Sequence, residues 1–190
     1  MRQSSILRLL LGMFFLVLAG CGGGGGDESG GDTGAATPQE TSGMVLETAS
    51  FPPGGNIPAK YTCDGDDTSP RLRIRDVPVE ARSLALVLED RDAPRGTFMH
   101  WAVWNIDPET TVIREGSVPP GAVVGTNDFG AAGFNGPCPP SGMHRYTFRL
   151  YALNRALTLP AGSDVAAFRG AVENTTIGEV TLDGKYGRTQ

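Results

Sequence analysis

The chain has 190 residues, which is enough for one domain with its own core and too few for two large ones. Its formal net charge of −5 excludes the strongly basic surface that nucleic-acid-binding domains carry, so we expect no nucleic-acid partner. The hydrophobic fraction of 39% is below that of most globular chains, because many of the 27 glycines fall outside any plausible core.

The first 20 residues have the pattern of an export signal. Arg2 and Arg8 flank the start of an apolar run over Ile6–Ala19, and a run of about 14 residues is too short to cross a bilayer comfortably. The run ends in Leu-Ala-Gly-Cys, which resembles the bacterial lipobox and would place lipid chains such as palmitate on Cys21. We therefore expect a lipoprotein signal peptide over residues 1–20 and an exported protein anchored to a cell membrane, periplasmic or on the outer surface. An ordinary signal peptide with a chance cysteine, or an uncleaved membrane anchor, is the alternative.

Residues 21–43 are rich in glycine and acidic side chains. They show no hydrophobic period, so this stretch cannot bury enough surface to offset its ordering entropy, and we predict a flexible tether. Its glycine run, Gly22–Gly26, lacks the lysine and the preceding strand of a phosphate-binding loop. The remaining residues, 44–190, are predicted to form one folded domain.

The pattern of this domain predicts mostly β-structure. Short apolar or alternating runs, typical of strands, occur at 83–89, 101–106, 146–153 and 177–182. Clusters of proline and glycine separate them and indicate turns. Only 163–173 predicts a helix, with Ser163 or Asp164 as its cap and with Val165, Phe168 and Val172 on one face. We therefore expect an all-β sandwich with a minor helix near the C-terminus.

Titratable side chains gather at the ends of three predicted strands. Asp90 and Asp92 follow the first, while His100 and His144 each precede another. With a side-chain period of two, His144 shares a strand face with Tyr146. If the three strands are neighbours, these groups meet at one rim of the sandwich, where functional sites tend to lie.

Two motifs in this region resemble those of the phosphatidylethanolamine-binding protein family. Asp90–Pro94, followed by His100–Val103, looks like the family's Asp-Pro-Asp-Ala-Pro segment and its downstream histidine, and Gly136–Tyr146 is similar to its Gly-Pro-x-Pro-Pro-x-Gly-x-His-Arg-Tyr signature. The resemblance spans roughly 49–187 and suggests the bacterial, Raf kinase inhibitor-like branch. It implies a Greek-key β-sandwich of two antiparallel sheets with small peripheral helices. Arg91 stands where the family usually has proline, and this leaves open whether Arg91 helps to bind an anion or points to solvent.

The same resemblance implies a small surface pocket for an anionic group. The ligand-binding residues that it implies are Asp90, Asp92, Pro94, His100, Trp101, Gly136, Pro137, Pro139, His144 and Tyr146. Imidazoles, a phenol and backbone N–H groups can bind a phosphate-like anion. An ionised Asp90 would repel that anion, so we expect it to pair with a histidine and fix its tautomer. Anion affinity should rise as the pH falls from about 8 to 6.

The cysteines suggest one disulfide. If Cys21 carries lipid, Cys63 and Cys138 are the remaining cysteines, and an even number of cysteines in an exported protein favours a disulfide. Both lie in segments that carry the family resemblance, so a bridge would hold the wall of the implied pocket. Two buried free thiols are the alternative.

Three functions compete at this stage. We favour a protein that binds an anionic small molecule or a phospholipid head group without chemistry and without a cofactor. The family also implies inhibition of a protein partner, although an exported protein does not meet cytosolic kinases. A hydrolase or metalloenzyme is third. The sequence contains neither a His-Glu-x-x-His zinc motif nor a Gly-x-Ser-x-Gly nucleophile elbow, so no catalytic residue and no metal site is predicted.

Overall fold

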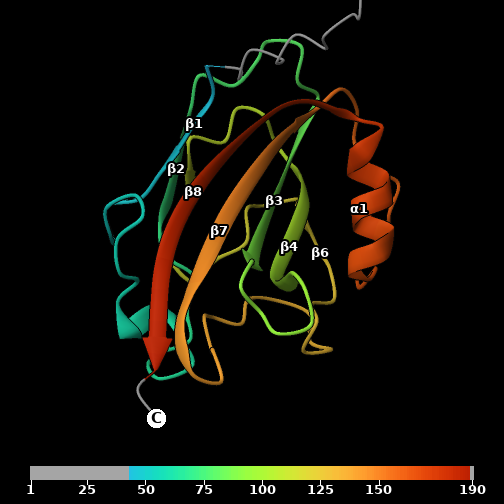
Figure 1. Cartoon of the computed structure of the whole chain (residues 1–190). Coiled ribbons are helices and arrows are strands. Elements are labelled where there is room, and N and C mark those ends of the chain that lie inside the picture. The colour runs from blue at the N-terminus through green and yellow to red at the C-terminus, as the bar shows by residue number, and fades with distance from the viewer. Residues whose placement is uncertain (1–42, 189–190) are drawn as a thin grey trace, which may run out of the picture. The chain divides into compact units, whose positions relative to one another are not determined.

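The structure is a computed structural model that describes residues 43–188. Two antiparallel sheets and one α-helix make up this part of the chain, so the predicted β-sandwich is confirmed (Figure 1). The predicted signal peptide, the lipidation of Cys21 and the tether up to residue 42 lie outside the described residues. Within residues 43–188 no helix combines the length and the apolar character needed to cross a membrane.

The larger sheet has the strand order β6-β4-β3-β7-β8. Its strands are β3 (Ser83–Asp90), β4 (Phe98–Ile106), β6 (Val123–Val124), β7 (Gly142–Leu153) and β8 (Thr176–Arg188). The smaller sheet has the order β1-β2-β5, with β1 (Val45–Glu47), β2 (Leu72–Arg75) and β5 (Val112–Ile113). A 3-10 helix (Ala59–Tyr61) and helix α1 (Val165–Glu173) complete the elements.

Strand β3 is buried on both faces, which explains its unbroken apolar run. Leu86 and Leu88 face the smaller sheet and pack in the main core with residues such as Ile74. Ala85 and Val87 face the opposite way and join a second core cluster under helix α1. A strand covered on one side only would show a polar alternation, which this segment lacks.

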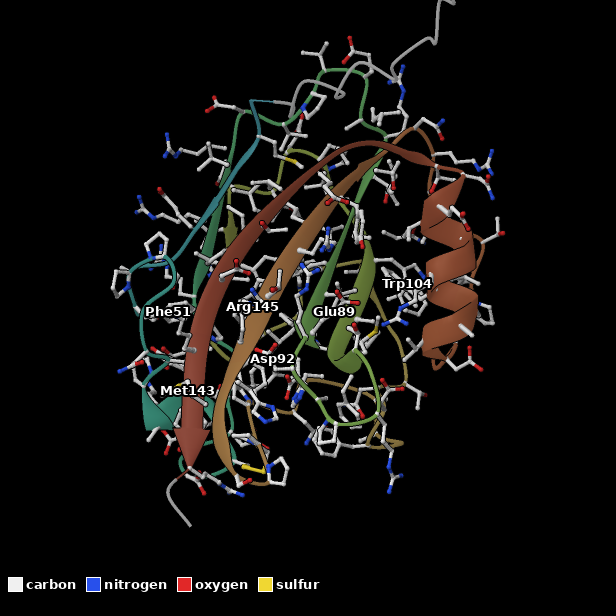
Figure 2. All side chains as sticks on the ribbon, viewed as in Figure 1. Phe51, Glu89, Asp92, Trp104, Met143 and Arg145 are labelled. Atoms are coloured by element: carbon white, nitrogen blue, oxygen red, sulfur yellow. A yellow bond between two sulfur atoms is a disulfide. The ribbon has the colours of Figure 1, made fainter. Side chains whose placement is uncertain are left out.

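Helix α1 covers the outer face of the larger sheet. Its N-cap is Asp164, one of the two predicted caps, and the Asp164 carboxylate accepts a 2.8 Å hydrogen bond from the Ala167 N–H. Phe168 and Val172 are its buried residues, and the Phe168 ring lies 5.9 Å from that of Trp104. Figure 2 shows Trp104 directed from β4 toward this helix. The small sheet and α1 therefore lie on opposite faces of the larger sheet.

The last strand is longer than its sequence pattern indicates. The apolar pattern predicted residues 177–182, but β8 has 13 residues and pairs with β7 from Leu153↔Thr176 to Gly142↔Arg188. Glycines break its apolar pattern, and one of them, Gly184, lies where a Cβ would come within 2.6 Å of the Ile57 side chain. Pairing along the whole of β7 therefore extends the strand beyond its local signal.

An irregularity in β4 positions one histidine. Leu88 pairs with Trp101 and Glu89 pairs with Met99, so His100 is an extra residue in the ladder. Strict alternation from Trp101 would turn His100 toward the outer face with Trp104. The bulge instead places its ring 5.4 Å from that of Tyr146, whose side chain belongs to the inner core.

Candidate functional site

A cavity of about 250 Å³ opens where β3 ends and β4 begins. Asp90 and His100 supply its buried polar wall, and the exposed Arg95 lies at its edge. The other lining residues are Ala93, Pro94, Gly96, Phe98, Phe129, Cys138 and Pro140. The cavity thus combines a few titratable groups with a mostly apolar wall, as ligand-binding pockets do.

Asp90 and His144 form a buried pair beside this cavity. The His144 Nδ1 lies 2.7 Å from Asp90 Oδ2, and the two residues are 8% and 4% exposed. An ionised carboxylate can only accept, so Nδ1 carries the proton and Nε2 is the remaining ring nitrogen. The other oxygen of Asp90 accepts a 2.9 Å bond from the Asp92 N–H. The structure therefore has the histidine–aspartate pairing that the sequence predicted.

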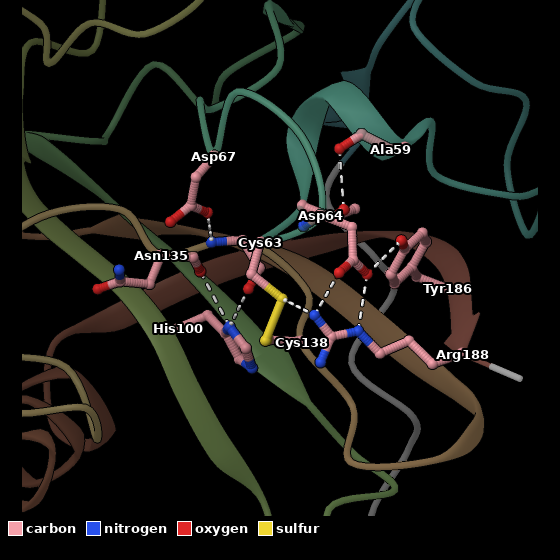
Figure 3. The surroundings of a disulfide bond; sticks show 11 residues. Ala59, Cys63, Asp64, Asp67, His100, Asn135, Cys138, Tyr186 and Arg188 are labelled. Atoms are coloured by element: carbon pink, nitrogen blue, oxygen red, sulfur yellow. Dashed lines mark hydrogen bonds and ion pairs between the residues drawn. A yellow bond between two sulfur atoms is a disulfide. The ribbon is translucent and has the colours of Figure 1, made fainter. Parts of the chain in front are cut away.

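His100 is held in one tautomer by two backbone carbonyls. Its Nδ1 donates to the carbonyl oxygens of Asn135 and Gly136 at 2.9 and 3.0 Å (Figure 3). Because carbonyls only accept, Nε2 is left as a lone-pair acceptor in the neutral ring. Burial lowers the pKa of His100, so the neutral form prevails at pH 7. Toward a ligand, the Nε2 of neutral His100 can therefore accept a hydrogen bond but cannot donate one.

The ring of Tyr146 packs against the rings of both histidines. Its ring centroid is 5.4 Å from that of His100 and 6.5 Å from that of His144. Among the described residues, its buried hydroxyl meets no partner at hydrogen-bond geometry. Burial raises the pKa of Tyr146, and the nearby Asp90 carboxylate raises it further. The hydroxyl therefore stays protonated and is a potential donor.

A disulfide ties the proline-rich loop to the 3-10 helix segment. Cys63 and Cys138 are bonded with a Cα–Cα distance of 5.5 Å, which confirms the predicted bridge (Figure 3). The Cys63 N–H also donates to the Pro137 carbonyl at 3.2 Å. The N–H of Gly136 donates to Asp67 Oδ1 at 2.6 Å, and a Cβ on this glycine would collide with the Tyr61 carbonyl oxygen. These contacts fix the loop that carries Cys138 into the cavity wall.

The other implied ligand residues lie away from the cavity surface. Trp101 is 1% exposed and packs in the main core against Phe134, with ring centroids 5.5 Å apart. Asp92 accepts a 2.8 Å bond from the Arg145 N–H and fastens the end of β3 to β7 (Figure 2 labels both residues). Pro137 and Pro139 are buried in their loop. Of the implied set, Asp90, Pro94 and His100 line the cavity directly, whereas His144 and Tyr146 are buried and do not line it.

Sequence reasoning missed the aromatic wall and its nearby cation. Arg95 follows the first motif directly, so its position was a usable signal. Phe129 had no such signal, because it lies in a loop after β6 that folds back onto β4. Asn127 holds this loop by donating to the His100 carbonyl at 3.2 Å. The rings of Phe98, Phe129 and His100 then meet edge to face, with centroids 4.8 to 5.3 Å apart.

The structure shows where Arg91 of the first motif points and how the chain passes through Pro94. The Arg91 side chain is exposed and does not line the cavity, while its N–H donates to the Arg145 carbonyl at 3.0 Å. The Ala93–Pro94 bond is trans, since residues 43–188 contain no cis peptide. In the same range no cluster of three or more histidine, cysteine, aspartate or glutamate side chains is arranged to hold a metal ion.

Comparison with known proteins decides the family. The sequence profile of the phosphatidylethanolamine-binding proteins matches residues 47–187, which is most of the chain. The chain belongs to the phosphatidylethanolamine-binding protein family. A UPF0098 protein of Methanothermobacter thermautotrophicus is 47% identical over 150 residues, which cover 76% of this chain and 99% of that protein. The assignment to the Raf kinase inhibitor-like branch stays a prediction.

Two crystal structures of family members have the same fold. A homologue of phosphatidylethanolamine-binding protein from Chlamydia trachomatis has a TM-score of 0.73 at 37% identity, covering 78% of this chain and 99% of its own. YbcL of Escherichia coli, described as a new member of the mammalian family, has a TM-score of 0.73 at 29% identity, with 77% and 99% covered. Almost the whole of each relative is matched, so this fold forms as a domain by itself.

Proposed function

We propose that this family member binds an anionic small molecule, or a phospholipid head group with a phosphate-like group, in the cavity beside His100. The observation that carries the proposal is the convergence of His100 and Arg95 on one cavity of about 250 Å³, in which the carboxylate of Asp90 is paired with His144. This volume lies below the usual range of drug-sized ligand sites, roughly 300–1,000 Å³. A head group fits such a space better than whole acyl chains do.

The tautomers favour a ligand that brings one proton. Neutral His100 offers the lone pair of Nε2, which pairs with the O–H of a singly protonated phosphate rather than with a bare anionic oxygen. The Arg95 cation attracts the negative charge, and the buried Tyr146 hydroxyl, which meets no hydrogen-bond partner among the described residues, belongs to a ring 5.4 Å from that of His100. A bound state that holds an extra proton, on the phosphate or on an imidazole, gains affinity as the pH falls.

The aromatic wall supports an organic substituent on the ligand. Phe98 and Phe129 present ring edges beside His100, and Phe129 is 50% exposed. These rings would cover the carbon chain of an ester such as phosphoethanolamine. Inorganic phosphate should therefore bind more weakly than a phosphate ester. Cys138 lines the cavity, but its sulfur is bonded to Cys63 and is therefore no free nucleophile. This favours ligand binding over nucleophilic catalysis by a thiol.

Titration calorimetry of the domain, residues 43–190, with phosphate, phosphoethanolamine and acetate tests this proposal. The informative variant is Arg95→Gln, with Arg91→Gln as its matched control, since both arginines are exposed and Arg91 does not line the cavity. Losing a charge-assisted contact should weaken phosphoethanolamine binding by about tenfold in Arg95→Gln and by less than about twofold in Arg91→Gln. No heat with any of the three anions, or equal losses in both variants, would overturn it.

We also propose that the exported chain is anchored to a membrane through lipid on Cys21. The support is the lipobox-like sequence, since this residue lies outside the described structure. Metabolic labelling with palmitate should mark the wild-type protein, and Cys21→Ser should abolish both the label and the membrane fraction. An unlabelled wild-type protein would remove the anchor from the proposal while leaving the anion site unaffected.

A further inference from the structure

The outer face of the small sheet carries four arginines. Side chains of β2 alternate, so the core receives Leu72 and Ile74 while Arg73 and Arg75 are exposed. Arg73 lies between Glu47 of β1 and Val112 of β5 in the sheet register. The same register, continued by two residues, sets the exposed Arg71 beside the exposed Arg114.

This face is cationic although the chain as a whole is acidic. The face also carries the carboxylate of Glu47, which forms a 3.0 Å ion pair with Arg75. Arg71, Arg73 and Arg114 take part in no salt bridge among the described residues. The next carboxylate along the chain, that of Glu115, is engaged by Lys60. Three positive charges therefore remain without a partner on one side of a short sheet.

Two of these arginines line an open cleft. The cleft has a volume of about 300 Å³ and is formed by Glu47, Thr48, Ala49, Arg71 and Arg73. Thr48 donates to the Arg71 carbonyl at 2.7 Å and so holds the backbone of the cleft in place. The cleft shares no residue with the cavity beside His100. The cleft is large enough for a phospholipid head group, and planar guanidinium groups bind phosphate in a bidentate manner.

We propose that this arginine face, comprising Arg71, Arg73, Arg75 and Arg114, docks on an anionic phospholipid surface. Two observations favour a lipid surface as the partner of this face: its positive charge, and its position next to the N-terminal strand of the domain. The described part begins at Gly43, two residues before β1, and β1 lies directly against β2. A lipid anchor on Cys21 would hold the domain within reach of an anionic surface, and the flexible tether predicted over residues 21–43 would leave the charge of the arginine face to decide which side meets the lipid. This inference rests on the proposed membrane anchor, but the surface itself can be tested without it.

Docking in this way would orient the molecule. Helix α1 packs on the opposite side of the larger sheet from the small sheet, so it would face away from the membrane (Figure 1). Each arginine near an anionic surface strengthens binding by about fivefold, and salt screens this attraction over roughly 10 Å at 0.1 M. Binding by the face should therefore depend on both lipid charge and ionic strength.

The test is flotation of the unlipidated domain, residues 43–190, with vesicles of phosphatidylcholine alone or with about 30 mol% phosphatidylglycerol. The domain should float with the anionic vesicles, and added salt should release it. Arg71→Gln/Arg73→Gln should lower the partition coefficient by about 25-fold. The matched control is Arg82→Gln/Arg155→Gln, which removes the same charge from two exposed arginines outside this sheet and should change it by less than about threefold.

Three outcomes would overturn the docking proposal. These are failure of the wild-type domain to float, equal losses in the two double variants, and equal binding to neutral and anionic vesicles. If the docking proposal fails, the partner of the arginine face should be sought among acidic proteins or polysaccharides. A His144→Ala domain that still floats would separate this surface from the anion cavity, and the assay is independent of lipid on Cys21.

Discussion

The imidazole of His144, on β7, donates a 2.7 Å hydrogen bond to the buried carboxylate of Asp90, the last residue of β3. The two strands are neighbours, and Asp90 lies opposite Tyr146 in their register, so the pair forms across the strand boundary. In the proposed site Asp90 would therefore fix the tautomer of His144, and a protonated His144 imidazole would offset the negative charge of Asp90. A carboxylate so close to the cavity would otherwise repel an anion.

Replacing this carboxylate should affect stability and binding differently from replacing its neighbour. Asp90→Asn weakens a buried, charge-assisted hydrogen bond and should lower the free energy of unfolding by about 1–3 kcal/mol. Asp92→Asn alters a largely exposed side chain, whose ion pair with Arg145 spans 3.4 Å, and should lower it by less than about 1 kcal/mol. Urea denaturation at pH 7 measures both variants. Similar losses in the two would contradict the role given to the Asp90–His144 pair.

His100 should make the domain less stable in mild acid. Burial lowers its pKa in the folded state, so the unfolded chain binds more protons once the pH falls below the unfolded value of about 6.5. Stability is therefore complete above that pH and is lost as the pH drops toward the folded pKa. The free energy of unfolding should fall between about pH 7 and 5 in the wild type and fall less steeply in His100→Gln. Parallel curves for the two proteins would refute this assignment.

The disulfide should support both the fold and the cavity. It closes a loop with a sequence separation of 75, so Cys63→Ala/Cys138→Ala should lower the free energy of unfolding by about 4 kcal/mol. Because Cys138 lines the cavity, the double variant should also bind phosphoethanolamine more weakly at temperatures where it remains folded. Denaturation and calorimetry on the same preparation separate these effects. Unchanged affinity in a folded variant would show that the loop holds its position without the bridge.

Gly136 should tolerate no side chain. A Cβ there collides with the Tyr61 carbonyl, so Gly136→Ala must displace the loop whose carbonyl holds His100. We expect a loss of about 1–3 kcal/mol in unfolding free energy together with weaker anion binding. The matched control is Gly170→Ala in α1, where a Cβ meets nothing within 4 Å, and this change should stabilise the helix by up to about 1 kcal/mol. A Gly136→Ala domain that binds like the wild type would contradict the prediction.

The local sequence determined the elements whose signal lies within a few residues. The unbroken apolar run of β3, the Asp164 cap and buried face of α1, and the strand at 146–153 all follow from side-chain periodicity and capping. The motifs around Asp90 and His144 indicated the family, and they pointed to the rim where the candidate cavity lies. Periodicity and motif matching use only neighbouring residues, so they work wherever local preference and tertiary structure agree.

Tertiary structure alone decided how the site is assembled. The bulge in β4 turned His100 to the inner face, the loop after β6 brought Phe129 over it, and the full pairing with β7 extended β8 through its glycines. The arginine face likewise arises because the sheet register aligns β1, β2 and β5. Each of these features depends on contacts between segments distant in the chain. Their free energy comes from strand pairing and burial, which no local pattern of residues encodes.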